Sequence, residues 1–320
     1  LSGDEVRKAL PMSDAVEAMK QAFSALSAGK AIVPARTHIA LPATGGDALF
    51  MPAADVEAGQ MCLKIVTLFE GNRAKGLPFI QAIVTLLDAS DGRTLAVMNG
   101  AMITAIRTGA ASGAATDLLA RTNAESVAIF GAGVQAQTQL EAVCAVRKIV
   151  RASVFDVSDE GAEAFAIEMS GRLGIPVRRA SSPKDNVTGA DVICTATTAD
   201  TPVFDDADLA PGVHINAVGS YKPHVREVPP ETVVRSRVVV DEVAAALEEA
   251  GDLIMPINDG LIDRDHMVAE LGEIVAGAKP GRNNDQEITF FKSVGVAIQD
   301  LAAAGRIYAN ALRDGLGVEL

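Results

Sequence analysis

The residues best suited to carry out chemistry begin at a glycine-rich stretch in the middle of the chain. Gly131, Gly133 and Ala136 form the pattern G-x-G-x-x-A directly after the apolar run 127–130. Such a turn lets the backbone approach a pyrophosphate, whose charge then lies at a helix N-terminus. Asp156 ends the next apolar run, at the spacing of a carboxylate that binds ribose hydroxyls. The stretch predicts a dinucleotide site; the alternative is a strand–helix turn that binds no nucleotide.

Three basic residues are candidates for binding an anionic substrate. Lys64 lies within the apolar run 61–66, and Arg107 lies among small and apolar residues at 104–111. An arginine buried in such surroundings requires an anionic partner, and its guanidinium fits carboxylate and phosphate alike. The alternative for Lys64 is exposure to solvent, and the alternative for Arg107 is a structural ion pair. Its local sequence predicts Arg36 at the surface.

The sequence lacks the residue patterns typical of metal sites and of nucleophilic acyl chemistry. The four histidines do not pair at metal-ligand spacing, and no G-x-S-x-G motif is present. Cys62, Cys144 and Cys194 form no C-x-x-C pair, and each lies in an apolar stretch, which predicts buried free thiols. We therefore expect neither a metal site nor nucleophilic acyl chemistry.

The composition narrows the class of partner. Among 320 residues, 28 are basic and 41 acidic, so the net charge is −13. This charge disfavours nucleic acid and anionic membranes as partners. The sequence shows no secretory signal pattern and no uncharged apolar run of membrane-spanning length. We therefore expect a cytoplasmic protein that acts on a small molecule.

The order of predicted elements indicates two domains. An amphipathic helix over 14–26, with Ser13 as a candidate cap, precedes strands over 61–69, 79–88 and 94–98 and a helix over 102–119. The three successive strands predict an antiparallel meander. A helical segment over 288–312 is expected to return and pack on this first domain.

From residue 124 strands and helices alternate, which predicts a parallel, doubly wound Rossmann sheet of the α/β class. The predicted elements are strand 126–130, helix 134–148, strand 152–155, helix 159–173 and strands 176–179, 191–195, 213–218 and 237–240. The predicted layout is a Rossmann domain (119–297) inserted in an α+β domain (1–118 and 298–320), with the reacting groups in a cleft between them. Loops 195–198 and 216–220 would lie at the carboxyl end of the sheet and line the cofactor, unless they are plain turns.

Longer motifs identify a family. They are MPA at 51–53, LKIV at 63–66, GLP at 76–78, AIRTGA at 105–110, the glycine loop, HINAVG at 214–219, EITFFKSVG at 287–295 and AIQD at 297–300. In these motifs, over nearly its whole length, the chain resembles the ornithine cyclodeaminase/mu-crystallin family. That family also includes archaeal alanine dehydrogenase and bacterial ketimine reductases.

The resemblance implies a separate function for each of the two domains. The α+β domain would form the substrate site and a homodimer, and the Rossmann domain would bind NAD(P). Hydride would pass between C4 of the nicotinamide and Cα of an amino or imino acid. Arg36, Lys64 and Arg107 would clamp the substrate carboxylate, which places Lys64 inward and gives Lys64 and Arg107 catalytic roles. Cofactor contacts are expected from Thr108, Gly131, Gly133, Val134, Gln135, Asp156, Thr195, Ala196, Thr197, Val218, Gly219 and Ser293.

Ser220 distinguishes between members of the family. Ornithine cyclodeaminases carry an aspartate at this position that handles the substrate amine, whereas mu-crystallin-like members carry serine, as here. We therefore expect reduction of a small imino acid of the Δ1-pyrroline-2-carboxylate type to an L-amino acid, with Ser220 as a catalytic residue. NADH is expected over NADPH because of Asp156. The alternatives are ornithine cyclodeaminase or alanine dehydrogenase, and a mu-crystallin-like protein that binds a small ligand.

Overall fold

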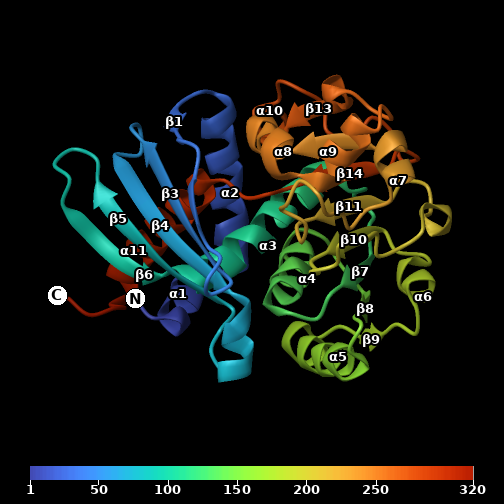
Figure 1. Cartoon of the computed structure of the whole chain (residues 1–320), viewed down its shortest axis with the longest axis horizontal. Coiled ribbons are helices and arrows are strands. Elements are labelled where there is room, and N and C mark those ends of the chain that lie inside the picture. The colour runs from blue at the N-terminus through green and yellow to red at the C-terminus, as the bar shows by residue number, and fades with distance from the viewer. Residues whose placement is uncertain (320) are drawn as a thin grey trace. The chain divides into compact units, whose positions relative to one another are not determined.

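The protein divides into two compact units. The computed structural model describes residues 1–319, the side chain of Arg73 excepted (Figure 1). Unit 1 comprises Leu1–Arg107 and Val296–Leu320, and unit 2 comprises Thr108–Gly295. The first boundary falls inside a long helix, whereas the sequence pattern placed it at the end of that helix.

Unit 1 is built on an antiparallel sheet. Its strands are β1 (Ala31–Ile32), β2 (Thr37–Leu41), β3 (Gly46–Asp55), β4 (Gln60–Phe69), β5 (Ile80–Asp88) and β6 (Thr94–Asn99). They run in the order β1-β3-β4-β5-β6, and β2 also pairs with β3. Every described pair is antiparallel, which confirms the predicted meander and adds β1, β2 and β3 to it.

Helices complete unit 1. They are α1 (Gly3–Ala9), α2 (Met12–Ser27), the short 3-10 helix η1 (Glu70–Lys75), the start of α3 (Gly100–Leu119) and the C-terminal α11 (Ala297–Asp314). Helix α11 packs on α2 and on β3, β4 and β5, as expected of a returning segment. Ser13 as the cap of α2 was wrong, because the helix begins one residue earlier, at Met12, and its N-cap is Pro11.

Unit 2 is built on a parallel sheet. Its strands are β7 (Ser126–Phe130), β8 (Arg151–Phe155), β9 (Val177–Arg179), β10 (Val192–Thr195), β11 (His214–Ala217), β12 (Arg237–Val240), β13 (Met267–Glu270) and β14 (Thr289–Lys292). The order is β13-β12-β14-β11-β10-β7-β8-β9, and each described pair is parallel. This confirms the doubly wound Rossmann sheet, whose order reverses at β7 and β10.

Helices connect these strands. They are α4 (Val134–Val146), α5 (Asp159–Leu173), α6 (Pro183–Val187), α7 (Pro230–Arg235), α8 (Val243–Glu249), α9 (Gly251–Asn258) and α10 (Leu271–Val275), with the 3-10 helices η2 (Asp206–Asp208) and η3 (Arg264–His266). Apolar residues from both faces of the sheet are buried beneath them, and this core fixes the carboxyl ends of the strands.

One predicted helix was partly wrong. Residues 288–312 do not form a single helix, because Thr289–Lys292 is strand β14, in the sheet between β11 and β12. Its threonine and two phenylalanines favour a buried strand, and they are fully buried here. Gly295, with φ of +81°, then turns the chain before α11 begins at Ala297.

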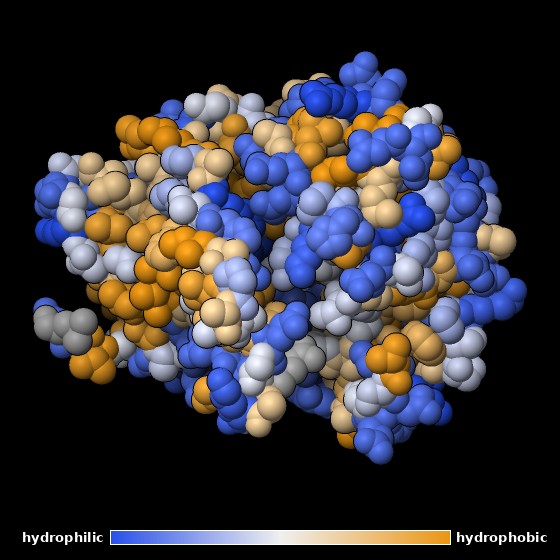
Figure 2. All heavy atoms as spheres, in the orientation of Figure 1, coloured by the Kyte–Doolittle hydropathy of each residue, from blue (hydrophilic) through white to orange (hydrophobic). Residues whose placement is uncertain are grey.

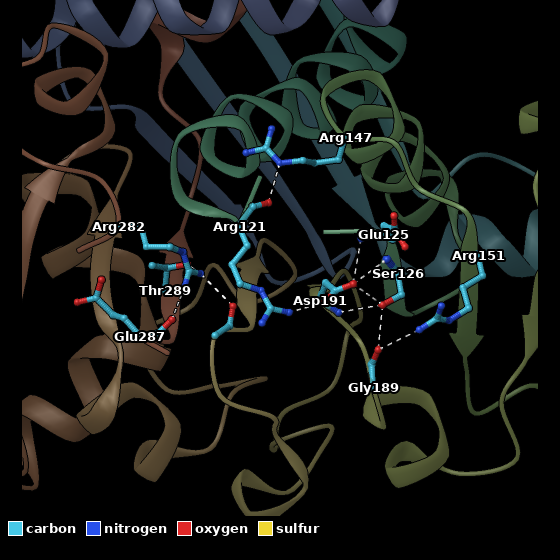
Figure 3. A network of polar contacts seen from close by, with 11 residues as sticks. Arg121, Glu125, Ser126, Arg147, Arg151, Gly189, Asp191, Arg282, Glu287 and Thr289 are labelled. Carbon is cyan, nitrogen blue, oxygen red and sulfur yellow. Dashed lines mark hydrogen bonds and ion pairs between the residues drawn. The ribbon is translucent and has the colours of Figure 1, made fainter. Parts of the chain in front are cut away.

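A polar network holds the amino ends of the unit 2 strands (Figure 3). The Asp191 carboxylate accepts the backbone N–H of Ser126 at 3.0 Å and pairs with Arg121. Arg282 donates to the Thr289 hydroxyl at 3.0 Å. These groups precede or begin their strands, so the network stabilises the end of the sheet opposite the glycine loop.

Two features are absent from residues 1–319. None of the described helices is long and apolar enough to cross a membrane. No described group of three or more His, Cys, Asp or Glu side chains is placed to hold a metal ion. The cysteines are free; Cys62 and Cys194 are buried as predicted, and Cys144 is only half-buried.

Candidate active site

The glycine loop of unit 2 has the form that a pyrophosphate needs. Gly131 has φ of +96°, and a Cβ atom there would lie 2.6 Å from the carbonyl oxygen of Ala196. Gly133 is the N-cap of α4 and makes no side-chain cap, and a Cβ on it would meet nothing within 4 Å. The first N–H groups of α4 are therefore left for an anion. This geometry fits the pyrophosphate of NAD(P).

Asp156 lies directly after β8 and is hydrogen-bonded to the glycine loop. One carboxylate oxygen accepts the N–H of Ala132 at 2.9 Å, and the other accepts that of Ser158 at 2.8 Å. The Ser158 hydroxyl caps α5 by accepting the N–H of Gly161 at 3.1 Å. The arrangement fits a carboxylate held ready for the ribose hydroxyls, beside a serine already engaged as a helix cap.

The loops after β10 and β11 lie beside the glycine loop. The N–H of Ala196 donates to the carbonyl of Phe130 at 3.0 Å, and that of Val218 donates to the carbonyl of Thr195 at 3.0 Å. Thr197 and Gly219 belong to the same two loops. The structure thus brings these sequence-predicted cofactor residues together at one edge of the sheet.

The other predicted cofactor residues have varied surroundings. Thr108 is buried near the middle of α3, and Val134, at the start of α4, is 57% exposed. The amide oxygen of Gln135 is buried without a partner among the described residues. Ser293 donates its hydroxyl to Asp241 at 2.8 Å. Their contact with a cofactor stays a prediction.

Lys64 points into unit 1. On β4 the side chains of Cys62, Lys64 and Val66 alternate with more exposed neighbours and are buried against the core. The ammonium of Lys64 lies 2.7 Å from a carboxylate oxygen of Asp300, on α11. The solvent-facing alternative for Lys64 was therefore wrong.

Arg107 shares the same carboxylate. Its Nε donates to Asp300 at 3.2 Å, and its Nη1 donates to Gln299 Oε1 at 2.7 Å. Arg36 is half-buried, and its charge also acts on Lys64. One carboxylate thus faces the two positive charges of Lys64 and Arg107, so this buried group of three side chains carries a net positive charge. We name Arg36, Lys64, Arg107 and Asp300 the cationic cluster.

Burial and neighbouring charges tune this cationic cluster. Burial lowers the pKa of Lys64, Asp300 opposes this, and Arg107 and Arg36 lower it further, to about 8. Burial raises the pKa of Asp300, but Lys64 and Arg107 outweigh that effect and hold it below its ordinary value. At neutral pH the ammonium and the carboxylate are therefore both charged.

The pKa of Lys64 predicts a loss of carboxylate binding in alkali. Lys64 is protonated below its pKa of about 8 and neutral above it, so the cationic cluster loses charge as the pH rises. We expect the inhibition constant of pyrrole-2-carboxylate, a planar acid ionised throughout this range, to rise about tenfold per pH unit above that point. The arginine of Lys64→Arg does not titrate here, so a similar rise in that variant would contradict the assignment.

Ser220 is held in the loop after β11. It is buried, its hydroxyl donates to the carbonyl of Val225 at 2.8 Å, and its N–H donates to Glu227 at 3.0 Å. The hydroxyl is therefore engaged with the chain, and its catalytic role stays a prediction.

The histidine of the HINAVG motif, His214, is structural. Burial, and then the charge of Arg282, lower the pKa of His214 to about 3, so its ring is neutral. The ring contacts Thr289 Oγ1 at 2.9 Å and Asn216 Oδ1 at 3.1 Å. It lies at the first residue of β11, at the amino end of the sheet.

Sequence reasoning missed two acidic residues of this arrangement. Asp300 stands in the AIQD motif, and a counter-ion was to be expected once Lys64 and Arg107 were placed in apolar surroundings. Glu227 follows β11 in a loop whose sequence gives no comparable signal, yet it is fully buried.

Known proteins are similar to this chain over its full length. The profile of the ornithine cyclodeaminase/mu-crystallin family matches residues 1–315. A Delta(1)-pyrroline-2-carboxylate reductase of Bacillus cereus is 40% identical over 318 residues, covering 99% of this chain and 98% of that protein. The structure of Thermococcus litoralis Delta(1)-pyrroline-2-carboxylate reductase in complex with NADH and L-proline matches with a TM-score of 0.96 and 44% identity, covering 100% and 99% of the two chains.

A second solved structure extends the comparison. An archaeal alanine dehydrogenase dimer with bound NAD matches with a TM-score of 0.93 and 35% identity, and the match covers 100% of this chain and 98% of that one. Fold, motifs and full-length similarity agree. The chain therefore belongs to the ornithine cyclodeaminase/mu-crystallin family.

Proposed function

We propose that this protein uses NADH to reduce Δ1-pyrroline-2-carboxylate, or a closely similar cyclic imino acid, to the L-amino acid. The observation that carries the proposal is the cationic cluster, in which Lys64 and Arg107 share a single buried carboxylate. The relative whose structure holds NADH and L-proline resembles this chain over its full length. An imino acid that carries one carboxylate complements the remaining positive charge.

The residues of unit 1 would orient the substrate. Lys64, Arg107 and Arg36 would bind its carboxylate, and Asp300 and Gln299 would hold the two buried cations in place. Fixing the carboxylate fixes the adjacent imine carbon, and orientation of this kind dominates hydride transfer. The nicotinamide, when bound to unit 2, supplies the hydride that this carbon accepts.

A substrate panel tests the proposal. The purified protein is given NADH with Δ1-pyrroline-2-carboxylate, NAD with L-ornithine, and NADH with pyruvate plus ammonia. We expect kcat/KM for the cyclic imine to exceed the other two clearly. Faster ammonia release from ornithine would establish a cyclodeaminase, and faster reaction of pyruvate would establish an alanine dehydrogenase. Binding of NADH without turnover of any substrate would indicate a binding protein.

The surroundings of Asp156 predict a preference for NADH over NADPH. Its carboxylate would bind the ribose 2′-hydroxyl and repel a 2′-phosphate. The Ser158 hydroxyl next to it already caps α5. We expect kcat/KM for NADH to exceed that for NADPH by about tenfold or more, and Asp156→Asn to narrow the gap. Equal use of both cofactors by the wild type would contradict this role of Asp156.

We also propose a homodimer formed through the sheet of unit 1. Apolar side chains gather on the surface of unit 1 (Figure 2). On the face of its sheet opposite α11, Ile83 is 47% and Val97 41% exposed. Leu63 and Ile65 lie on the same face of β4. A similar structure is a dimer with bound NAD. Light scattering should give twice the chain mass for the wild type and a lower mass for Ile83→Lys; a monomeric wild type would refute the proposal.

A further inference from the structure

We propose that Glu227 is a positioning residue that holds both cofactor-facing loops of unit 2 and thereby sets the affinity for NADH. Its side chain is fully buried, so it acts through the loops and not by touching a ligand. The inference rests on the proposed function, because it takes the loops after β10 and β11 as parts of the cofactor site.

The Glu227 carboxylate joins two loops that are separate in sequence. Oε1 accepts the N–H and the hydroxyl of Thr197, each at 2.7 Å. Oε2 accepts the hydroxyl of Thr195 and the N–H of Ser220, each at 3.0 Å. Each oxygen is saturated by donors, so the carboxylate fixes the spacing between the loop after β10 and the loop after β11.

Close packing leaves these loops little freedom. A Cβ atom on Gly219 would collide with both carboxylate oxygens of Glu227 and with the carbonyl of Thr197. On its other side, the loop after β10 meets the glycine loop, where a Cβ on Gly131 would lie 2.6 Å from the Ala196 carbonyl oxygen. Residues 195–197 are therefore held between Glu227 and the glycine loop.

A second layer of buried charge holds Glu227 itself. Asp252 accepts the N–H of Glu227 at 2.8 Å and that of Val228 at 3.0 Å. Lys292, at the end of β14, lies 2.8 Å from Asp252 and donates to the carbonyl of Ser220 at 2.5 Å. Burial and then the charge of Asp252 raise the pKa of Glu227, whereas Lys292 and Thr197 lower it. Glu227 is thus anchored to the sheet while it holds the loops.

The test keeps the shape of the Glu227 side chain and removes its charge. Glu227→Gln keeps the size of the side chain but turns one acceptor oxygen into an amide NH₂, which would face two of the four donors that now bind Glu227. We expect the Kd for NADH, measured by fluorescence titration without substrate, to rise about tenfold or more, and kcat to fall. The KM for the imino acid should not change, because the cationic cluster lies in unit 1.

Two further variants make the result specific. Thr195 is fully buried, and Thr195→Val removes only the hydrogen bond from its hydroxyl to Glu227. This variant should raise the Kd for NADH by a few-fold, and it remains informative if Glu227→Gln does not fold. Asp191→Asn changes a carboxylate at the amino ends of the same strands and should lower the melting temperature while leaving the Kd for NADH unchanged. Unchanged NADH binding in both Glu227→Gln and Thr195→Val would overturn the inference. Failure of the wild type to bind NADH would instead overturn the proposed function.

Discussion

Lys64→Met and Arg107→Leu are each expected to lower kcat/KM for the imino acid by about 30- to 1000-fold. Each change removes one charge-assisted contact to the substrate carboxylate, a loss of about 2–4 kcal/mol in transition-state stabilisation. NADH binding should be unaffected, because both side chains belong to unit 1. Steady-state kinetics with varied imino acid, together with an NADH titration, measures the two effects separately.

The Asp300 carboxylate pairs with both Lys64 and Arg107, so each of these variants also affects stability, and a change at Asp300 provides the control. Removing Lys64 leaves Asp300 buried with only Arg107 as a close partner, and breaking a buried ion pair costs about 3–5 kcal/mol of stability. The double variant Lys64→Met/Asp300→Asn removes both charges and should regain part of the lost stability. Activity should stay low in the double variant. If activity returned together with stability, Lys64 would be a structural residue and not a substrate ligand.

Ser220→Asp is expected to abolish measurable reduction of the imino acid and to lower the free energy of unfolding by about 3–5 kcal/mol. A carboxylate there cannot donate to the Val225 carbonyl, and it would be buried beside Glu227 and Asp252 with Lys292 as the nearby cation. Thermal unfolding and NADH titration measure the damage. A stable Ser220→Asp variant with normal reductase activity would contradict the buried geometry of this loop.

Ser220→Ala is the matched control for that change. It removes a single neutral hydrogen bond, worth about 1 kcal/mol, so activity should fall by about tenfold or less. A much larger fall in kcat at unchanged melting temperature would instead show that the Ser220 hydroxyl takes part in catalysis, as the family resemblance implies. The pair of variants thus separates the structural role of Ser220 from the catalytic one.

Periodicity made most of the fold predictable. Alternation of strands and helices after residue 124 identified the parallel sheet, since each element carries its own local pattern. The strand Thr289–Lys292 was not predicted, because a short, fully buried strand shows no apolar–polar alternation and resembles the start of the helix that follows it. The strands β1 and β2 were not predicted because β1 has only two residues and every residue of β2 is exposed, so neither strand has one buried and one exposed face.

The candidate site was predictable where its residues lie close in sequence. The glycine loop and Asp156 belong to one strand–helix–strand unit, so spacing alone related them. Lys64, Arg107 and Asp300 come from β4, α3 and α11, and only packing within unit 1 brings them together. Glu227 is bound to Thr195 and Thr197 from another loop, which no local pattern encodes.

Transfer of a labelled hydride tests the central claim most directly. The protein is incubated with Δ1-pyrroline-2-carboxylate and NADH deuterated at C4, in each of the two configurations separately, and the product is analysed by NMR and mass spectrometry. We predict L-proline with deuterium at Cα from one configuration only, formed in step with the loss of NADH. Proline without deuterium from either labelled NADH, or NADH that is not consumed, would contradict the account.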